Sequence, residues 1–116
     1  MLIRISDDSE APLHAQIAGQ LRQAIVRGDV KDGDRLPAVR SLADGLGVNM
    51  HTVLRAYREL EADGVLDVRQ GRGASVRTGG RQRARELLAL IDRIFVDAGK
   101  KGLTPVQVAA LLEGQL

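Results

Sequence analysis

Arginine side chains are concentrated in one stretch of this chain, and they are the residues best suited to bind a negatively charged partner. Every basic residue from position 35 to position 77 is an arginine, and the seven are Arg35, Arg40, Arg55, Arg58, Arg69, Arg72 and Arg77. A guanidinium group donates forked hydrogen bonds that match a phosphate or the edge of a guanine base. Five acidic residues lie in the same stretch, so its formal net charge is only +2. The placement of the arginines therefore matters more than their number.

Two predicted helices position several of these arginines. A short helix runs from about Ala38 to Gly45, and the turn after it is flanked by Gly45 and Gly47. Asn49 has the side chain of an N-cap, and it predicts a longer helix that ends near Asp63. On this longer helix the apolar face is formed by Val53, Ala56, Tyr57 and Leu60. The opposite face, which we expect to be the reading surface, carries His51, Leu54, Arg55 and Arg58.

A basic glycine hairpin follows these helices. Residues 65–69 and 74–78 alternate as extended strands, with Leu66, Val68 and Val76 pointing inward. The tip between them reads Gln70-Gly71-Arg72-Gly73. An exposed helix fits the major groove of DNA and a narrow ribbon fits a neighbouring groove, so this order of elements favours a DNA partner.

The rest of the chain predicts three more helices. One begins at Pro12 and stops at Gly28, and it supports the core. After a linker at Gly79-Gly80, residues 81–98 form a helix whose apolar residues cover more than half of its circumference. A capping box at residues 104–107 starts the last helix. The sequence thus predicts a mostly α fold with a small β wing, divided into residues 1–78 and residues 79–116.

Composition excludes several classes of function. The chain has two histidines and no cysteine, and it lacks a dinucleotide fingerprint and a phosphate-binding loop, so we expect neither an enzyme nor a metal or cofactor site. Aromatic residues make up only 2%, which argues against a stacking platform for single strands. No signal peptide or membrane-length apolar run is present, so a cytoplasmic protein is expected.

Several motifs follow one another between residues 12 and 76. They are Gly33-Asp34-Arg35-Leu36-Pro37-Ala38-Val39-Arg40, Leu46-Gly47-Val48, Thr52-Val53, Arg55-Ala56-Tyr57 and Gly71-Arg72-Gly73. In this order they make residues 12–76 similar to the DNA-binding half of the GntR family of bacterial transcription regulators. The short helical remainder resembles the YtrA subfamily, whose C-terminal part is a pair of helices. The resemblance implies a winged helix-turn-helix domain followed by a two-helix dimerisation region.

The resemblance also implies a function and its residues. It implies a homodimeric repressor that binds a pseudo-palindromic operator in double-stranded DNA and regulates an operon that often includes transporter genes. DNA contacts would come from Arg40, which takes the place of the arginine before the second helix in the family. They would also come from Asn49, Met50, His51 and Thr52 at the start of the third helix, and from Gly71 with Arg72 at the wing tip. Many family members carry arginine at the positions of Met50 and Leu54, so these two residues either contact a thymine methyl group or simply pack.

Some alternatives stay open at this point. Arg55 and Arg58 either contact DNA or are ordinary surface arginines, and Arg58 has a possible partner in Glu61 three residues on. Phe95 and the leucines around it either line an effector pocket or pack across a dimer, and the absence of polar groups among them favours packing. The rival class of function is a winged-helix protein-interaction module without sequence-specific DNA binding.

Overall fold

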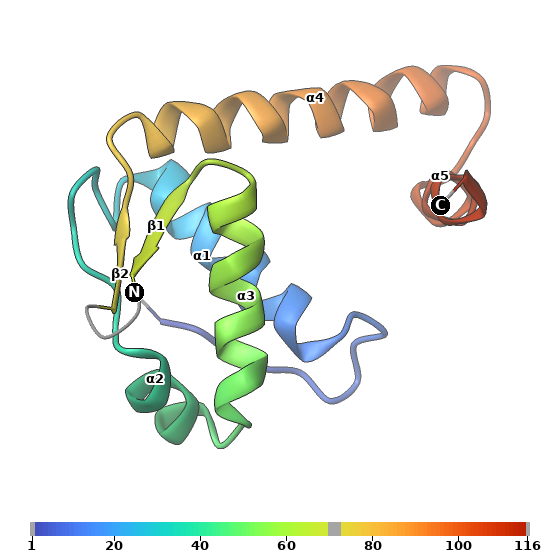
Figure 1. The fold of residues 1–116 in the computed structure, drawn as a ribbon. Coiled ribbons are helices and arrows are strands. Elements are labelled where there is room, and N and C mark those ends of the chain that lie inside the picture. The colour runs from blue at the N-terminus through green and yellow to red at the C-terminus, as the bar shows by residue number, and fades with distance from the viewer. Residues whose placement is uncertain (1, 70–72, 116) are drawn as a thin grey trace. The chain divides into compact units, whose positions relative to one another are not determined.

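The computed structural model describes residues 2–69 and 73–115 and confirms a mostly α fold with a small wing (Figure 1). Its elements are α1 (Leu13–Arg27), α2 (Val39–Leu46), α3 (Met50–Ala62), β1 (Leu66–Arg69), β2 (Gly73–Val76), α4 (Gly80–Lys100) and α5 (Pro105–Gln115). The chain forms two compact units, residues 1–84 and residues 85–116. The division predicted between residues 78 and 79 stays a prediction, and the compact units divide a little later, within α4.

The core of the first unit lies between α1, α3 and the wing. Ile17, Leu21 and Ile25 of α1 are fully buried, and they face a buried stripe on α3 that includes Tyr57 and Leu60. The ends of α1 are those that the sequence predicts. Its first residue follows a proline, and Gly28 ends it in the left-handed conformation, with φ of 86°.

α2 ends one residue later than predicted. Gly45 lies inside α2, the last helical residue is Leu46, and Gly47 caps the helix with a φ of 69° that suits glycine. Asn49 caps α3 as predicted, because its Oδ1 accepts a hydrogen bond of 2.8 Å from the backbone N–H of His51. This cap fixes where the first turn of α3 begins.

The wing has one more strand-like segment than the sequence predicts. β1 and β2 pair antiparallel, with Leu66 opposite Val76 and Arg69 opposite Gly73. Residues 33–36 lie along the other edge of β2, as Figure 1 shows, and their backbone bonds to residues 74 and 76 measure 2.8 to 2.9 Å. The missed pairing joins segments about forty residues apart, and buried Leu36 anchors it. The segment satisfies backbone groups of β2 that an isolated hairpin would leave to solvent.

The start of α4 is built into the first unit. Gly80, predicted to belong to a linker, is instead the first residue of α4 and is buried. A Cβ atom at this position would lie 2.4 Å from the carbonyl oxygen of Val65, so only glycine fits without a shift. Asp32 accepts hydrogen bonds from the backbone N–H groups of Gly79 and Arg81, at 2.9 and 3.1 Å. The Nε groups of Arg81 and Arg83 donate to carbonyl oxygens at the ends of α1 and α3.

The second unit contains the remaining part of α4 and α5. The predicted capping box is present, since Thr104 and Gln107 exchange hydrogen bonds of 2.9 and 3.2 Å. Val108 is buried, whereas many large apolar side chains are exposed in the single chain. These exposed residues are Leu90, Ile91, Ile94, Val96, Val106, Leu111 and Leu112.

Candidate nucleic-acid interface

The first turn of α3 presents the predicted base-reading residues at the surface. Asn49, Met50 and His51 are exposed, and Thr52 is half-buried. Because the carbonyl oxygen of the Asn49 side chain is engaged as the cap, the side-chain nitrogen is the group of Asn49 suited to reach a base. The N-terminal end of α3 thus carries polar side chains on an ordered backbone.

A groove of about 660 Å³ lies between the start of α2, the outer face of α3 and the wing. It is lined by Ala38, Val39, Arg40, Met50, Leu54, Arg58, Val68, Arg69 and Gly73. The predicted site residues Arg40, Met50 and Arg58 therefore meet on one surface. His51 and Arg55 are exposed on α3 but do not line this groove.

Arg69 is a lining residue that was not among the predicted contacts. It lies at the end of β1 and is exposed, and the only sequence signal for it was membership of the arginine-rich stretch. Its place in the groove depends on how the wing folds against α3, which a local pattern does not encode. Arg69 therefore joins Arg40 and Arg58 as the third cation of the groove.

Arg58 has the partner that the sequence allowed. Its Nη1 lies 2.9 Å from Oε1 of Glu61, and the other carboxylate oxygen accepts a hydrogen bond of 3.2 Å from the backbone N–H of Val68. The hydrogen bond from Arg58 lowers the pKa of Glu61 below its ordinary value of 4.5, with smaller contributions from the Val68 N–H and the Arg58 charge, while burial opposes the shift. This carboxylate ties α3 to β1 and holds Arg58 beside the groove.

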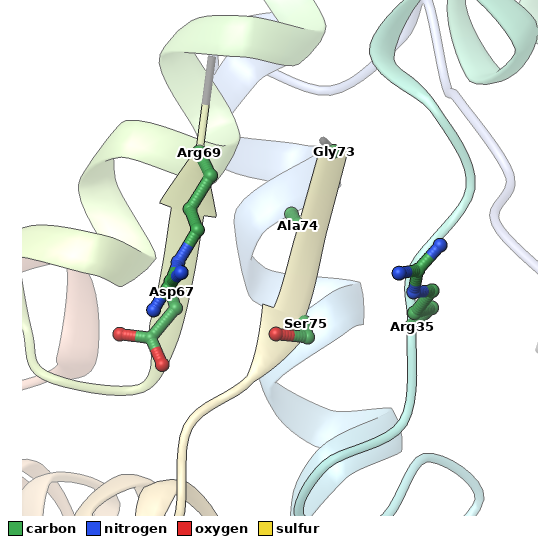
Figure 2. A pocket seen from close by; sticks show the side chains of 6 residues that line it. All are labelled: Arg35, Asp67, Arg69, Gly73, Ala74 and Ser75. Atoms are coloured by element: carbon green, nitrogen blue, oxygen red, sulfur yellow. The ribbon is translucent and has the colours of Figure 1, made fainter. Parts of the chain in front are cut away.

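The outer face of the wing carries two arginines, Arg35 and the Arg69 that also lines the groove. Figure 2 shows Asp67 of β1, Ser75 of β2 and Arg35 of the neighbouring segment in a row across the sheet, with Arg69 next to Asp67. These side chains line a pocket of about 220 Å³. Arg35 and Arg69 thus stand on the same face of the wing, on either side of β2.

Tyr57 connects α3 to the segment that leads into α2. Its side chain is fully buried, and its hydroxyl donates a 2.7 Å hydrogen bond to the carbonyl oxygen of Pro37. Burial raises the pKa of this phenol to about 12, so it stays protonated and able to donate. The bond fixes the chain three residues before Arg40, which sets the position of that arginine relative to α3.

The predicted wing-tip contacts, Gly71 and Arg72, lie outside the described residues. Across residues 2–69 and 73–115, no group of three or more His, Cys, Asp or Glu side chains is placed to hold a metal ion. In the same part of the chain, no helix combines the length and apolar character needed to cross a membrane.

Comparison with known proteins identifies relatives of this domain. A family model described as "Bacterial regulatory proteins, gntR family" matches residues 13–76. The HTH-type transcriptional repressor YtrA of Bacillus subtilis is 39% identical over 75 residues, which cover 65% of this chain and 58% of that relative. The match therefore spans less than two thirds of that relative's length.

Two solved structures resemble this chain in fold. YtrA from Sulfolobus acidocaldarius, a GntR-family transcription factor, is 38% identical with a TM-score of 0.65, over 80% of this chain and 96% of that one. A crystal structure of AraR(DBD) in complex with operator ORX1 is 28% identical with a TM-score of 0.56, over 63% of this chain and 90% of that one. The second structure shows a related domain bound to operator DNA.

Proposed function

Because the chain belongs to the gntR family of bacterial regulatory proteins, we propose that it binds double-stranded DNA in a sequence-specific manner and regulates transcription. The observation that carries the proposal is the groove between α2, α3 and the wing, which Arg40, Arg58 and Arg69 line together with Met50 of the first turn of α3. Cations that flank a protruding helix suit the two phosphate backbones on either side of a major groove. The operator complex of AraR(DBD) supports this use of the fold.

The proposed contacts follow from where each residue lies. Arg40 and Arg55 are exposed and contact phosphate, while Asn49, His51 and Thr52 reach base edges from the start of α3. Arg58 exchanges part of its interaction with Glu61 for a contact with DNA. Gly71 and Arg72 at the wing tip stay a prediction from the sequence, in which the tip enters a neighbouring minor groove.

A salt titration separates this function from its rival, a protein-interaction module without sequence-specific DNA binding. Binding of the full chain to duplexes selected from a random-sequence pool is measured by fluorescence anisotropy at increasing salt. We expect the affinity to fall steeply with salt, because arginine contacts with phosphate release bound counterions. We also expect enrichment of one sequence. Absence of duplex binding at low salt would overturn the proposal, and binding without sequence enrichment would favour the rival.

We further propose that two copies bind together through residues 85–116. The exposed apolar side chains of this unit lose contact with water when a second copy covers them, which favours association. A two-fold axis then places two recognition helices about one helical turn apart, or slightly more, on a pseudo-palindromic operator.

We also propose that the protein represses transcription. A repressor role is supported by the name of the Bacillus subtilis relative. The proposed DNA partner of this chain would place the protein in the bacterial cytoplasm. The regulated operon, with transporter genes among its members, stays a prediction from the resemblance. A small-molecule effector has no support in the described residues. The relatives are transcription regulators, and we propose no catalytic activity.

A further inference from the structure

We propose that Met50 and Leu54 read thymine methyl groups, so that the groove selects A·T pairs within each half-site. This inference rests on the proposed function and adds to it the chemical feature that the protein recognises. It concerns the two apolar side chains that α3 contributes to the groove. Arginine at such positions would favour guanine. The apolar side chains here change what the same docking geometry can read.

The lining of the groove is partly apolar and partly cationic. Met50 is 37% exposed and Leu54 is half-buried, and Val39 of α2 and Val68 of β1 line the groove with them. Its cations are Arg40, Arg58 and Arg69, and none of the described residues that line it is acidic. Two carboxylates lie beside these arginines: Glu61 is engaged with Arg58, and Asp67 lies next to Arg69 on the outer face of the wing.

This combination favours duplex DNA over a small apolar ligand as the occupant. Three arginines in the lining complement the phosphates of the two strands. Between those phosphates, the major-groove edge of a base pair offers one apolar group, the C5 methyl of thymine. A groove that combines apolar side chains with cations therefore matches a thymine edge between phosphates.

The spacing on α3 sets how many methyl groups are read. Met50 and Leu54 are four residues apart, on one face of the helix and about 6 Å apart along its axis. Successive bases on one strand rise by about 3.4 Å. We therefore expect the two side chains to cover methyl groups on adjacent or next-adjacent base pairs.

The experiment replaces single thymines by deoxyuridine, which removes the methyl group and leaves base pairing intact. The full chain first selects a tight duplex from a random-sequence pool. Each thymine of that duplex is then replaced in turn, and the dissociation constant is measured by fluorescence anisotropy. We expect one or two positions in each half-site where deoxyuridine weakens binding about fourfold, as burial of one methyl group predicts.

Variants then assign the effect to the two side chains. For each of Leu54→Ala and Met50→Ala, one thymine position should lose its effect. At the position that the missing side chain reads, the variant should bind the thymine duplex and the deoxyuridine duplex with equal affinity. Leu13→Ala is the matched control, because Leu13 is also 37% exposed, lies on α1 and does not line the groove. It should keep the fourfold preference for thymine.

Three outcomes would overturn the inference. Salt-dependent, sequence-specific binding without any deoxyuridine effect would leave the proposed function intact and refute methyl reading. If both variants weaken binding to thymine and deoxyuridine duplexes by the same factor, the side chains support α3 and do not read bases. Absence of any duplex binding would remove the proposed function itself.

Discussion

Arg40 is the second residue of α2, and its side chain is exposed at the groove beside α3. Arg40→Ala should therefore weaken operator binding roughly tenfold, as loss of one charge-assisted hydrogen bond predicts, and lower the salt dependence by about one counterion. Because the side chain is not part of the core, the unfolding temperature should stay unchanged. Arg27→Ala removes the same charge from an exposed site outside the groove and is the control. If both variants lost the same amount of operator affinity, the effect would come from the net charge of the protein and not from a contact of Arg40.

Glu61 links pH to the stability of the first unit. Its folded pKa lies below the ordinary value of 4.5, chiefly because Arg58 donates to its carboxylate. A depressed carboxyl pKa contributes stability that is present above the unfolded pKa and is lost as the pH falls through the folded pKa. Glu61→Gln should thus unfold at lower urea concentration than the wild type near pH 7, and the difference should shrink below about pH 4.5.

The control for this variant is Glu10→Gln, which changes an exposed carboxyl group on the same unit. Its urea midpoint should follow the wild type at every pH. A gap between Glu61→Gln and the wild type that persists unchanged at low pH would show that the Arg58 pair is not its source.

At the scale of single residues, the sequence predicts what depends on neighbours along the chain. The Asn49 cap follows from its side-chain chemistry and the exposure of His51, Arg55 and Arg58 from helical spacing, and the structure has them. Arg69 was missed as a lining residue because its place depends on the pairing of β1 with β2 and on the packing of the wing against α3. The Arg58–Glu61 pair was foreseen only as one of two alternatives.

At the scale of elements, the first turn of α4 is held by contacts that only the fold reveals. Gly80→Ala should destabilise the protein by about 1–3 kcal/mol, because its Cβ would meet the Val65 carbonyl oxygen at 2.4 Å and the backbone must shift. Gly99→Ala is the matched control on the same helix, since nothing lies within 4 Å of its Cβ position. Helix propensity predicts that this control gains up to about 1 kcal/mol. In urea unfolding, we expect the two substitutions to change the free energy of unfolding in opposite directions. Changes in the same direction would contradict the close approach of the Cβ at position 80 to the Val65 carbonyl oxygen.

The same contrast explains which element boundaries the sequence predicts. Pro12, Gly28 and the capping box at residues 104–107 act within a few residues, so the ends of α1 and the start of α5 are found correctly. The Gly79-Gly80 pair has the composition of a linker, but Asp32 and Val65 bring it into the packed unit. Leu36 before Pro37 predicts an extended backbone, but the pairing of residues 33–36 with β2 has no local signal, because the partners lie about forty residues later.

At the scale of the whole molecule, the two compact units separate DNA binding from the proposed pairing of subunits. Residues 1–84 contain the groove and include the first turn of α4, with buried Gly80 and Ala84. A truncation after residue 78 would remove these core residues, so an informative truncation ends at Ala84. The exposed apolar side chains of α4 and α5 all lie beyond this point.

The truncated protein should be a monomer that binds a two-half-site operator about a hundredfold more weakly than the full chain, because linkage makes the second contact intramolecular. Light scattering measures the mass, and anisotropy measures the affinity. A duplex with a single half-site is the control, and both proteins should bind it with similar affinity.

Ile94→Asp in the full chain tests the same point without a deletion, since a charge at this exposed apolar site disfavours burial in an interface. If the truncated protein remained a tight dimer, the pairing surface would have to lie within residues 1–84, and the symmetry of the operator would then be set by the DNA-binding unit itself.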